Sequence, residues 1–347
     1  MNTEIILDSL TSELIPGNIE YTVLLPPGYN KESAPLPLLL NMHGGGLERN
    51  YLAEPETRAM YEKLWAEGAL PPMVVACYSA RGGWHLNYRD GTEKWEDFAF
   101  EFMQFIQKTY NTDPAQTHNY LTGISMGAMG SLRLTLKYPE RFGAVAAMEG
   151  VINPVLNYDD LQPRNFGMQH NGSPEVQGPR WGWPVDKDYY HANNHANIAQ
   201  NNAAAIREHG PKIYLECGDH DYYNAHDGAE FLHRVLWENR IEHEYRLLHD
   251  CDHVGSSLAW RVEDAHRWLG RMAKTLINPQ PLAEPTAAQQ DYINRAYRGL
   301  VTTPPSEEEK LSLYDEAAIL AHRRGIPDFL AKYADSPLEG VFRKPQR

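Results

Sequence analysis

One short stretch is decisive for the fold of this 347-residue chain, the run Gly123-Ile124-Ser125-Met126-Gly127. It has the G-x-S-x-G form, in which a serine lies on a strained turn between a strand and a helix with its hydroxyl exposed above a sheet. Small residues flank such a serine because neighbouring backbone crowds the turn. The pattern alone is weak, but here it follows an apolar strand at 119–123 and begins a predicted helix at 126–138. The context favours Ser125 as a nucleophile.

Strands and helices alternate on both sides of this stretch. Further strands are predicted at 20–25, 38–42, 73–78, 144–148, 212–217 and 243–248, and helices at 55–70, 95–110, 229–239 and 257–276. This alternation predicts an α/β protein with a mostly parallel central sheet and helices on both faces. We therefore predict one domain over residues 1–278.

Two segments break the alternation. Residues 151–210 are rich in Asn, Pro and Gly, with one predicted helix at 198–208. An insertion of this length usually forms a lid or substrate wall, and otherwise simply an ordered surface segment. Beyond Pro279, Ser306 with Glu309 three residues later is a capping-box signature for a helix to about Arg324. We predict a helical C-terminal extension over 279–347, which is a candidate surface for homo-oligomer formation.

A second glycine-rich run, His43-Gly44-Gly45-Gly46, follows the strand at 38–42. Glycines here let the backbone approach a substrate and leave N–H groups free to face a developing oxyanion. Taken alone, the run could equally be a glycine-rich turn. Paired with the serine turn, it predicts an oxyanion hole formed by the amides of Gly45, Gly46 and Met126, with His43 and Gly44 beside the substrate.

A serine nucleophile requires a base and an orienting acid, which in this architecture follow in the order serine, acid, histidine. The run GDHD at 218–221 ends one late strand, and HDCDH at 249–253 follows the last strand. Both would lie at the edge of the sheet that presents Ser125. We predict Asp221 as the acid and His253 as the base.

Two neighbours of these residues stay open as alternatives, Asp219 for the acid and His249 for the base. His253 is preferred because it begins a Gly- and Ser-containing loop before the final helix, whereas His249 is nearly within the strand. Catalytic groups usually lie on loops that a rigid scaffold positions.

Five pieces of sequence occur in a characteristic order: LLPPGY at 24–29, HGGG at 43–46, WEDF at 95–98, GISMG at 123–127 and YPERF at 138–142. In this order they resemble the putative-esterase family of α/β-hydrolases, which includes esterase D-like and feruloyl-esterase-like enzymes. The resemblance extends from about residue 21 to residue 276. It does not cover the C-terminal extension or the long insertion, where we expect substrate choice to be determined.

The resemblance implies the α/β-hydrolase fold and hydrolysis of carboxylic esters without a cofactor, with Ser125, Asp221 and His253 in the roles given above. Two departures from the family pattern stand out. Ala128 replaces a glycine that is common after the serine turn, and the loop from His253 to Trp260 is longer than usual. The second departure leaves the base less firmly assigned than the nucleophile.

The charge of the chain limits its partners. There are 32 Lys and Arg against 46 Asp and Glu, a net charge of −14, which argues against nucleic acid and anionic membranes because basic surfaces bind both. No apolar run approaches the roughly 18–20 residues of a membrane span. The first twenty residues have no basic region of a secretory signal, so we expect a cytoplasmic location for the chain as given.

Metal binding is not expected. Three scattered cysteines, Cys77, Cys217 and Cys251, are too few for a structural zinc site or a disulfide framework. His191 and His195 are four residues apart and could share a helix face, but no carboxylate accompanies them at ligand spacing. We predict no metal and no cofactor.

Aromatic residues gather in segments expected above the serine, namely Trp84, Trp181, Trp183, Tyr189 and Tyr190. They could line a pocket for an aryl or bulky acyl group, or simply pack the insertion onto the body of the domain. The leading hypothesis is a serine carboxylesterase acting on small, neutral esters. A thioesterase, a small-peptide hydrolase and a non-catalytic binding protein with the same fold are the alternatives.

Overall fold

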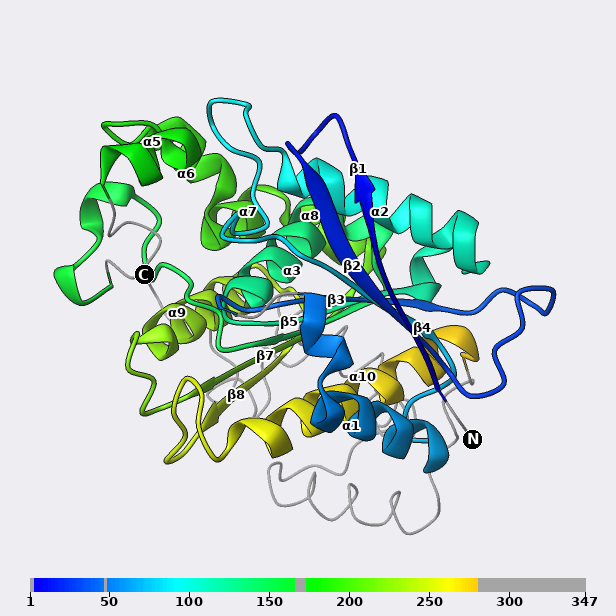
Figure 1. The fold of residues 1–347 in the computed structure, drawn as a ribbon. Coiled ribbons are helices and arrows are strands. Elements are labelled where there is room, and N and C mark those ends of the chain that lie inside the picture. The colour runs from blue at the N-terminus through cyan, green and yellow to red at the C-terminus, as the bar shows by residue number, and fades with distance from the viewer. Residues whose placement is uncertain (1–2, 47–48, 166–172, 280–347) are drawn as a thin grey trace, which may run out of the picture. The chain divides into compact units, whose positions relative to one another are not determined.

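A single sheet organises the computed structural model, which describes residues 3–46, 49–165 and 173–279 (Figure 1). Its strand order is β1-β2-β4-β3-β5-β6-β7-β8. The strands are β1 Glu4–Thr11, β2 Asn18–Leu25, β3 Leu38–Met42, β4 Val74–Tyr78, β5 Asn119–Ile124, β6 Ala144–Met148, β7 Lys212–Gly218 and β8 Glu244–Leu248. Strand β2 pairs antiparallel with β1 and β4, and the remaining pairs are parallel. The carboxyl ends of β3, β5, β6, β7 and β8 therefore meet at one edge.

Helices cover both faces of this sheet (Figure 1). One face carries α2 Trp95–Tyr110, α3 Met126–Lys137 and α9 Ala225–Glu238, and the other carries α1 Pro55–Ala66 and α10 Leu258–Ile277. Strand β3 shows how one strand serves both layers, because Leu38 and Leu40 belong to one core cluster and Leu39 to the other. Burial on both faces explains the continuous apolar runs of the sequence. The predicted α/β-hydrolase fold is confirmed.

Strand β1 was not expected from the sequence. Among the described residues it is an edge strand that pairs only with β2, and its side chains are all exposed or partly exposed. Polar residues such as Asp8 and Ser9 interrupt its apolar pattern. The strand forms because its backbone completes a hairpin with β2, which the periodicity of its side chains does not reveal.

The insertion holds more helix than predicted. It contains α5 Pro174–Trp181, α6 Lys187–Asn193, α7 His195–Asn201 and α8 Ala203–His209, so the prediction of one helix at 198–208 was wrong. Asn202 ends one helix and begins the next, and its side-chain amide donates to the Leu136 carbonyl at 2.7 Å. This contact to α3 ties the break to the body of the domain, and asparagine favours such helix ends.

Short 3-10 helices complete the described elements: η1 Arg49–Ala53, η2 Gln116–His118, η3 Pro139–Arg141, η4 Tyr158–Asp160 and η5 Pro163–Asn165. The predicted helix from Ser306 to Arg324, and the extension beyond Pro279, lie outside the described residues. Among the helices that the structure does describe, none has the length and apolar character needed to cross a membrane.

Buried histidines couple the stability of this fold to pH. The ring of His266 donates from Nδ1 to the Val262 carbonyl at 2.7 Å and lies 2.8 Å through Nε2 from the Tyr61 hydroxyl. Burial lowers the pKa of His266 to about 4 and that of His195 to about 3. From about pH 6.5 down to these values, the unfolded chain takes up protons that the folded chain excludes. Acid therefore favours unfolding.

We expect His266→Gln to make the free energy of unfolding less dependent on pH between pH 6 and 4.5. The slope should fall by about 1.4 kcal/mol per pH unit, the contribution of one proton. Urea unfolding at a series of pH values measures it, and His209→Gln at an exposed position is the control for the histidine-to-glutamine substitution itself. A His266→Gln slope equal to that of the wild type would contradict the argument, whatever the absolute loss of stability.

Candidate active site

Ser125 lies on the turn between β5 and α3, in the left-handed region with φ 55° and ψ −114°. Close packing explains why a glycine, Gly127, follows two residues after Ser125. A Cβ atom on Gly127 would lie 1.8 Å from the carbonyl oxygen of Met42, at the end of β3. The backbone of β3 and the start of α3 can approach this closely only without a side chain there. The turn holds Ser125 in a conformation that is costly for a residue with a Cβ atom.

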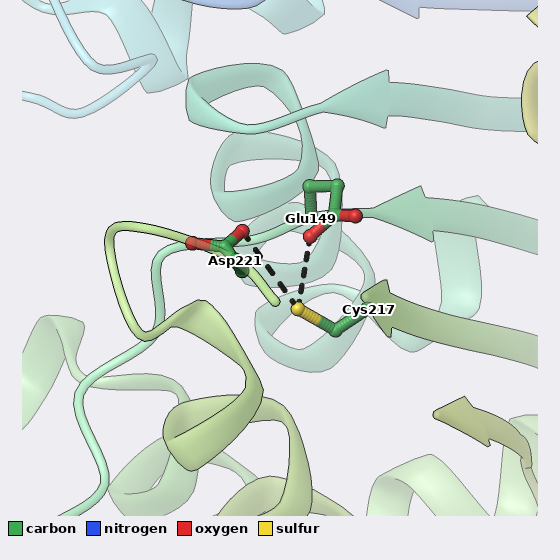
Figure 2. A group of neighbouring side chains, drawn as sticks. All are labelled: Glu149, Cys217 and Asp221. Carbon is green, nitrogen blue, oxygen red and sulfur yellow. Dashed lines mark hydrogen bonds between the residues drawn. The ribbon is translucent and has the colours of Figure 1, made fainter. Parts of the chain in front are cut away.

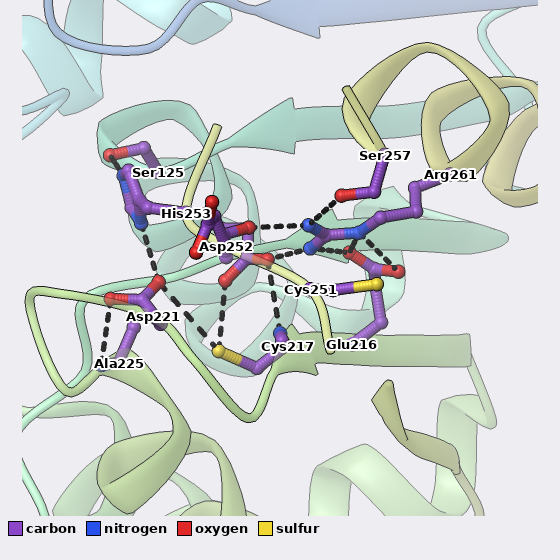
Figure 3. Close-up of polar contacts among 12 residues, drawn as sticks. Ser125, Glu216, Cys217, Asp221, Ala225, Cys251, Asp252, His253, Ser257 and Arg261 are labelled. Carbon is purple, nitrogen blue, oxygen red and sulfur yellow. Dashed lines mark hydrogen bonds and ion pairs between the residues drawn. The ribbon is translucent and has the colours of Figure 1, made fainter. Parts of the chain in front are cut away.

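A chain of hydrogen bonds links Ser125 to two later loops (Figure 3). Nε2 of His253, from the loop after β8, lies 2.9 Å from Ser125 Oγ, and Nδ1 lies 2.6 Å from Oδ2 of Asp221, from the loop after β7. The amides of Tyr223 and Ala225 donate to the other Asp221 oxygen, at 2.7 and 3.3 Å. A carboxylate held this way accepts the Nδ1 proton, which leaves the Nε2 lone pair for the serine hydroxyl. His253 and Asp221 are buried.

The two alternative residues pair with each other instead. Nδ1 of His249 lies 2.8 Å from Oδ2 of Asp219, and the His249 side chain is 89% exposed. This hydrogen bond raises the pKa of His249 and lowers the pKa of Asp219. The structure thus brings Asp221 and His253, rather than Asp219 and His249, to the serine.

The glycine-rich run lies beside the turn. A Cβ atom on Gly44 would be 3.6 Å from that of Ser125, whereas one on Gly45 or Gly46 would meet nothing within 4 Å. The His43 ring is buried, with Nε2 accepting from the Ala80 amide at 2.8 Å. His43 therefore supports the loop from inside, while Gly45 and Gly46 face open space.

Met126 is the first residue of α3. The first amides of a helix have no partner within the helix, and they carry the positive end of its dipole. This amide directly follows the serine, so the residue predicted as an oxyanion donor lies where a helix naturally offers one.

Comparison with known protein families identifies the family of this chain. The model of the family described as "Putative esterase" matches residues 12–277. The chain belongs to this family. The chain is called an esterase-family protein below.

Solved structures with the same fold include a ferulic acid esterase, with a TM-score of 0.64 and 22% identity over 78% of this chain and 98% of that one. They also include the S-formylglutathione hydrolase FrmB of Staphylococcus aureus, with a TM-score of 0.62 and 16% identity over 79% of this chain and all of that one, 100%. Identities this low show the fold alone.

The curated relatives match only part of this chain and part of their own length. The uncharacterized protein YbbA of Bacillus subtilis is 24% identical over 158 residues, 40% of this chain and 59% of YbbA. Esterase Rv1288 of Mycobacterium tuberculosis is 25% identical over 132 residues, 37% of this chain and 28% of Rv1288. The match therefore spans less than two thirds of either relative.

The predicted aromatic residues of this esterase-family protein occupy different environments. Trp181 is 3% exposed and packs in a small cluster with Leu86 and Tyr190. Trp84 is partly buried and packs against this cluster and the main core, whereas Trp183 is 57% exposed. Trp181 thus packs the insertion onto the body of the domain, which is one of the two interpretations given above.

Two aromatic residues beside the histidine were missed from the sequence. The ring centroids of Tyr222 and Tyr223 lie 5.5 and 4.7 Å from that of His253, and Tyr222 is 59% exposed. They directly follow Asp221 in the chain. That adjacency was the available signal, because a residue next to the acid on a short loop must lie near the base that the acid binds.

One group of three side chains with metal-ligand atoms occurs among the described residues, namely Glu149, Cys217 and Asp221 (Figure 2). Hydrogen bonds already account for it. The Cys217 thiol donates to Glu149 Oε2 at 2.9 Å and lies 3.9 Å from Asp221 Oδ2. Burial raises the pKa of Cys217, which keeps the sulfur protonated. The hydrogen bonding of the Cys217 thiol therefore explains why the three side chains lie together.

Proposed function

We propose that this esterase-family protein is a serine carboxylesterase that acts through an acyl-enzyme. Ser125 Oγ attacks the ester carbonyl carbon while His253 Nε2 takes its proton, and Asp221 stabilises the imidazolium. The amides of Gly45, Gly46 and Met126 stabilise the oxyanion of the tetrahedral intermediate. The His253 proton then passes to the departing alcohol. Water, deprotonated by the same histidine, attacks the acyl carbonyl and releases the acid and Ser125.

The continuous hydrogen-bond chain from Ser125 through His253 to Asp221 carries this proposal. Its two distances lie within the range that a nucleophile, a base and an orienting acid require. The serine is also partly accessible to solvent, which a nucleophile must be.

Within esters, we infer a preference for neutral substrates with an aryl group. The net charge of −14 disfavours anionic substrates at long range. The exposed Tyr222 ring beside His253 offers an apolar face on which an aryl group can stack, and a ferulic acid esterase is among the structural relatives. Thioester hydrolysis is the second candidate, because an S-formylglutathione hydrolase is also among them.

Fluorophosphonate labelling followed by peptide mapping tests the nucleophile. We expect one label per chain, on Ser125, because the reagent needs a serine that an adjacent base activates. Labelling of a different serine, or no labelling of folded protein, would refute the assignment.

A substrate panel tests the preference with ethyl acetate, the ethyl ester of an aryl-substituted acid (the aryl-acyl ester) and an acyl thioester. We expect Tyr222→Ala to raise KM for the aryl-acyl ester about 5- to 10-fold, the loss of one aromatic contact, and to leave KM for the acetate within about twofold. Faster turnover of the thioester would favour the second candidate. Equal changes in KM for both esters would show that Tyr222 does not select aryl groups.

A further inference from the structure

Three ionisable side chains next to the loops of the serine, histidine and aspartate are fully buried. Glu149 follows β6, Glu216 belongs to β7 and Arg261 belongs to α10. Arg261 Nη2 contacts Glu149 and lies 2.6 Å from Glu216 Oε1, while its Nε lies 3.1 Å from the same oxygen (Figure 3). Such a buried cluster is weak evidence for stability, because apolar residues of similar volume often stabilise a fold as well. Its contacts to neighbouring loops indicate what else it does.

One of these contacts reaches the loop that carries the base. Arg261 Nη1 donates to the carbonyl oxygen of Asp252 at 2.6 Å (Figure 3). Asp252 directly precedes His253, and the same nitrogen lies 3.4 Å from Oγ of Ser257 at the other end of the loop. A planar guanidinium has five donors in a fixed fork and can bind two carboxylates and a carbonyl from different sides, whereas an ammonium group offers three donors from a single nitrogen. Arg261 therefore joins the His253 loop to the ends of two strands.

A second contact reaches the loop that carries the acid. Glu149 Oε1 accepts from the Gly218 amide at 3.0 Å, and its Oε2 accepts from the Cys217 thiol at 2.9 Å. The same sulfur lies 3.9 Å from Asp221 Oδ2 (Figure 2). Glu149 itself has φ 54°, so its backbone adopts a rare conformation to place this carboxylate.

We propose that Arg261, with Glu149 as its partner, is a positioning residue. It holds His253 at hydrogen-bond distance from both Ser125 and Asp221. The inference rests on the proposed function. The buried charges hold the loop after β7 and the loop after β8 so that their catalytic side chains stay at hydrogen-bond distance from each other. A displacement of about 1 Å between reacting groups can cost about 100-fold in rate, so the effect of losing the tie belongs in kcat rather than in KM.

Arg261→Lys keeps the charge and loses the fork of donors. We expect kcat to fall about 10- to 100-fold with KM within about threefold of wild type, and the rate of fluorophosphonate labelling to fall in parallel. The matched control is Arg267→Lys on the same helix. Arg267 pairs with Glu263 and Glu67 at the protein surface, and its replacement should leave kcat within about twofold.

A second variant tests whether kcat falls because the catalytic groups are displaced or because the protein is less stable. Arg261→Met combined with Glu149→Gln and Glu216→Leu removes every buried charge of the cluster and keeps a side-chain acceptor for the Gly218 amide, so its melting temperature should stay near that of the wild type. We expect kcat to remain at least about 10-fold low, because the tie to Asp252 is still missing. Recovery of activity with stability, or wild-type kcat in folded Arg261→Lys, would overturn the inference.

The same experiment keeps the two proposals apart. Wild-type protein and Ser125→Ala are assayed on the same ester as the Arg261 variants. If wild type and Ser125→Ala are equally inactive, or equally active, the proposed function fails. If Ser125→Ala alone loses activity while every Arg261 variant keeps wild-type kcat, the function stands and only the positioning role fails.

Discussion

Replacing Ser125 by alanine is expected to lower kcat for ester hydrolysis by about 10⁴- to 10⁶-fold. The loss is this large because the hydroxyl forms and breaks the covalent bond to the acyl group, so no neighbouring group can take over its step. The residual rate should come from the oxyanion-hole amides and substrate binding alone, as it does when a triad is disabled. Initial rates on p-nitrophenyl acetate measure the change, and circular dichroism shows that the variant is folded.

Ser131→Ala is the matched control for this prediction. Ser131 lies on the same helix, α3, is buried, and donates to the Ala128 carbonyl at 3.1 Å. Its replacement should change kcat by no more than about twofold, because only a local hydrogen bond within the helix is lost. A Ser125→Ala protein with near-native kcat would remove the basis of the proposed mechanism.

His253→Ala is expected to lower kcat by about 10⁴- to 10⁶-fold as well, because the serine hydroxyl loses the base that removes its proton. The effect should be non-additive with Ser125→Ala, since both residues act in one step. Steady-state kinetics of the two single variants and the double variant measure this.

His249→Ala is the control that the chain itself provides. It lies four residues earlier on the same loop, is exposed, and pairs with Asp219 at the surface. We expect kcat within about threefold of wild type, the size of a surface ion-pair effect. The opposite pattern, with His249 essential and His253 dispensable, would show that the base had been chosen wrongly.

The fold was predictable because most of its strands are buried on both faces. Val74–Tyr78 and Ala144–Met148 are fully buried and appear in the sequence as apolar runs. Strand β1 lacked that signal because its side chains are only partly buried or exposed. The short helices of the insertion were also missed, since packing against the domain, and not their own periodicity, sustains helices of seven or eight residues.

The candidate site was predictable where chemistry requires a local pattern. The serine turn needs small neighbours within two residues, so Ser125 could be predicted from five letters together with the apolar strand before them and the helix after them. The choice of Asp221 and His253 over their neighbours stayed open at that stage, because two acids and two histidines stand on the same loops. The structure brings one pair to Ser125 and leaves the other at the surface.

The sequence by itself determined the class of fold, the serine and the order in which acid and base follow it, since burial pattern and a crowded turn are properties of neighbouring residues. Only the tertiary structure decided which aspartate and histidine meet the serine and which buried charges stand behind them. Glu149, Glu216 and Arg261 share no motif and are up to 112 positions apart (261 − 149). Their contacts exist because parallel strands end at one edge of a sheet and α10 packs against one face of it.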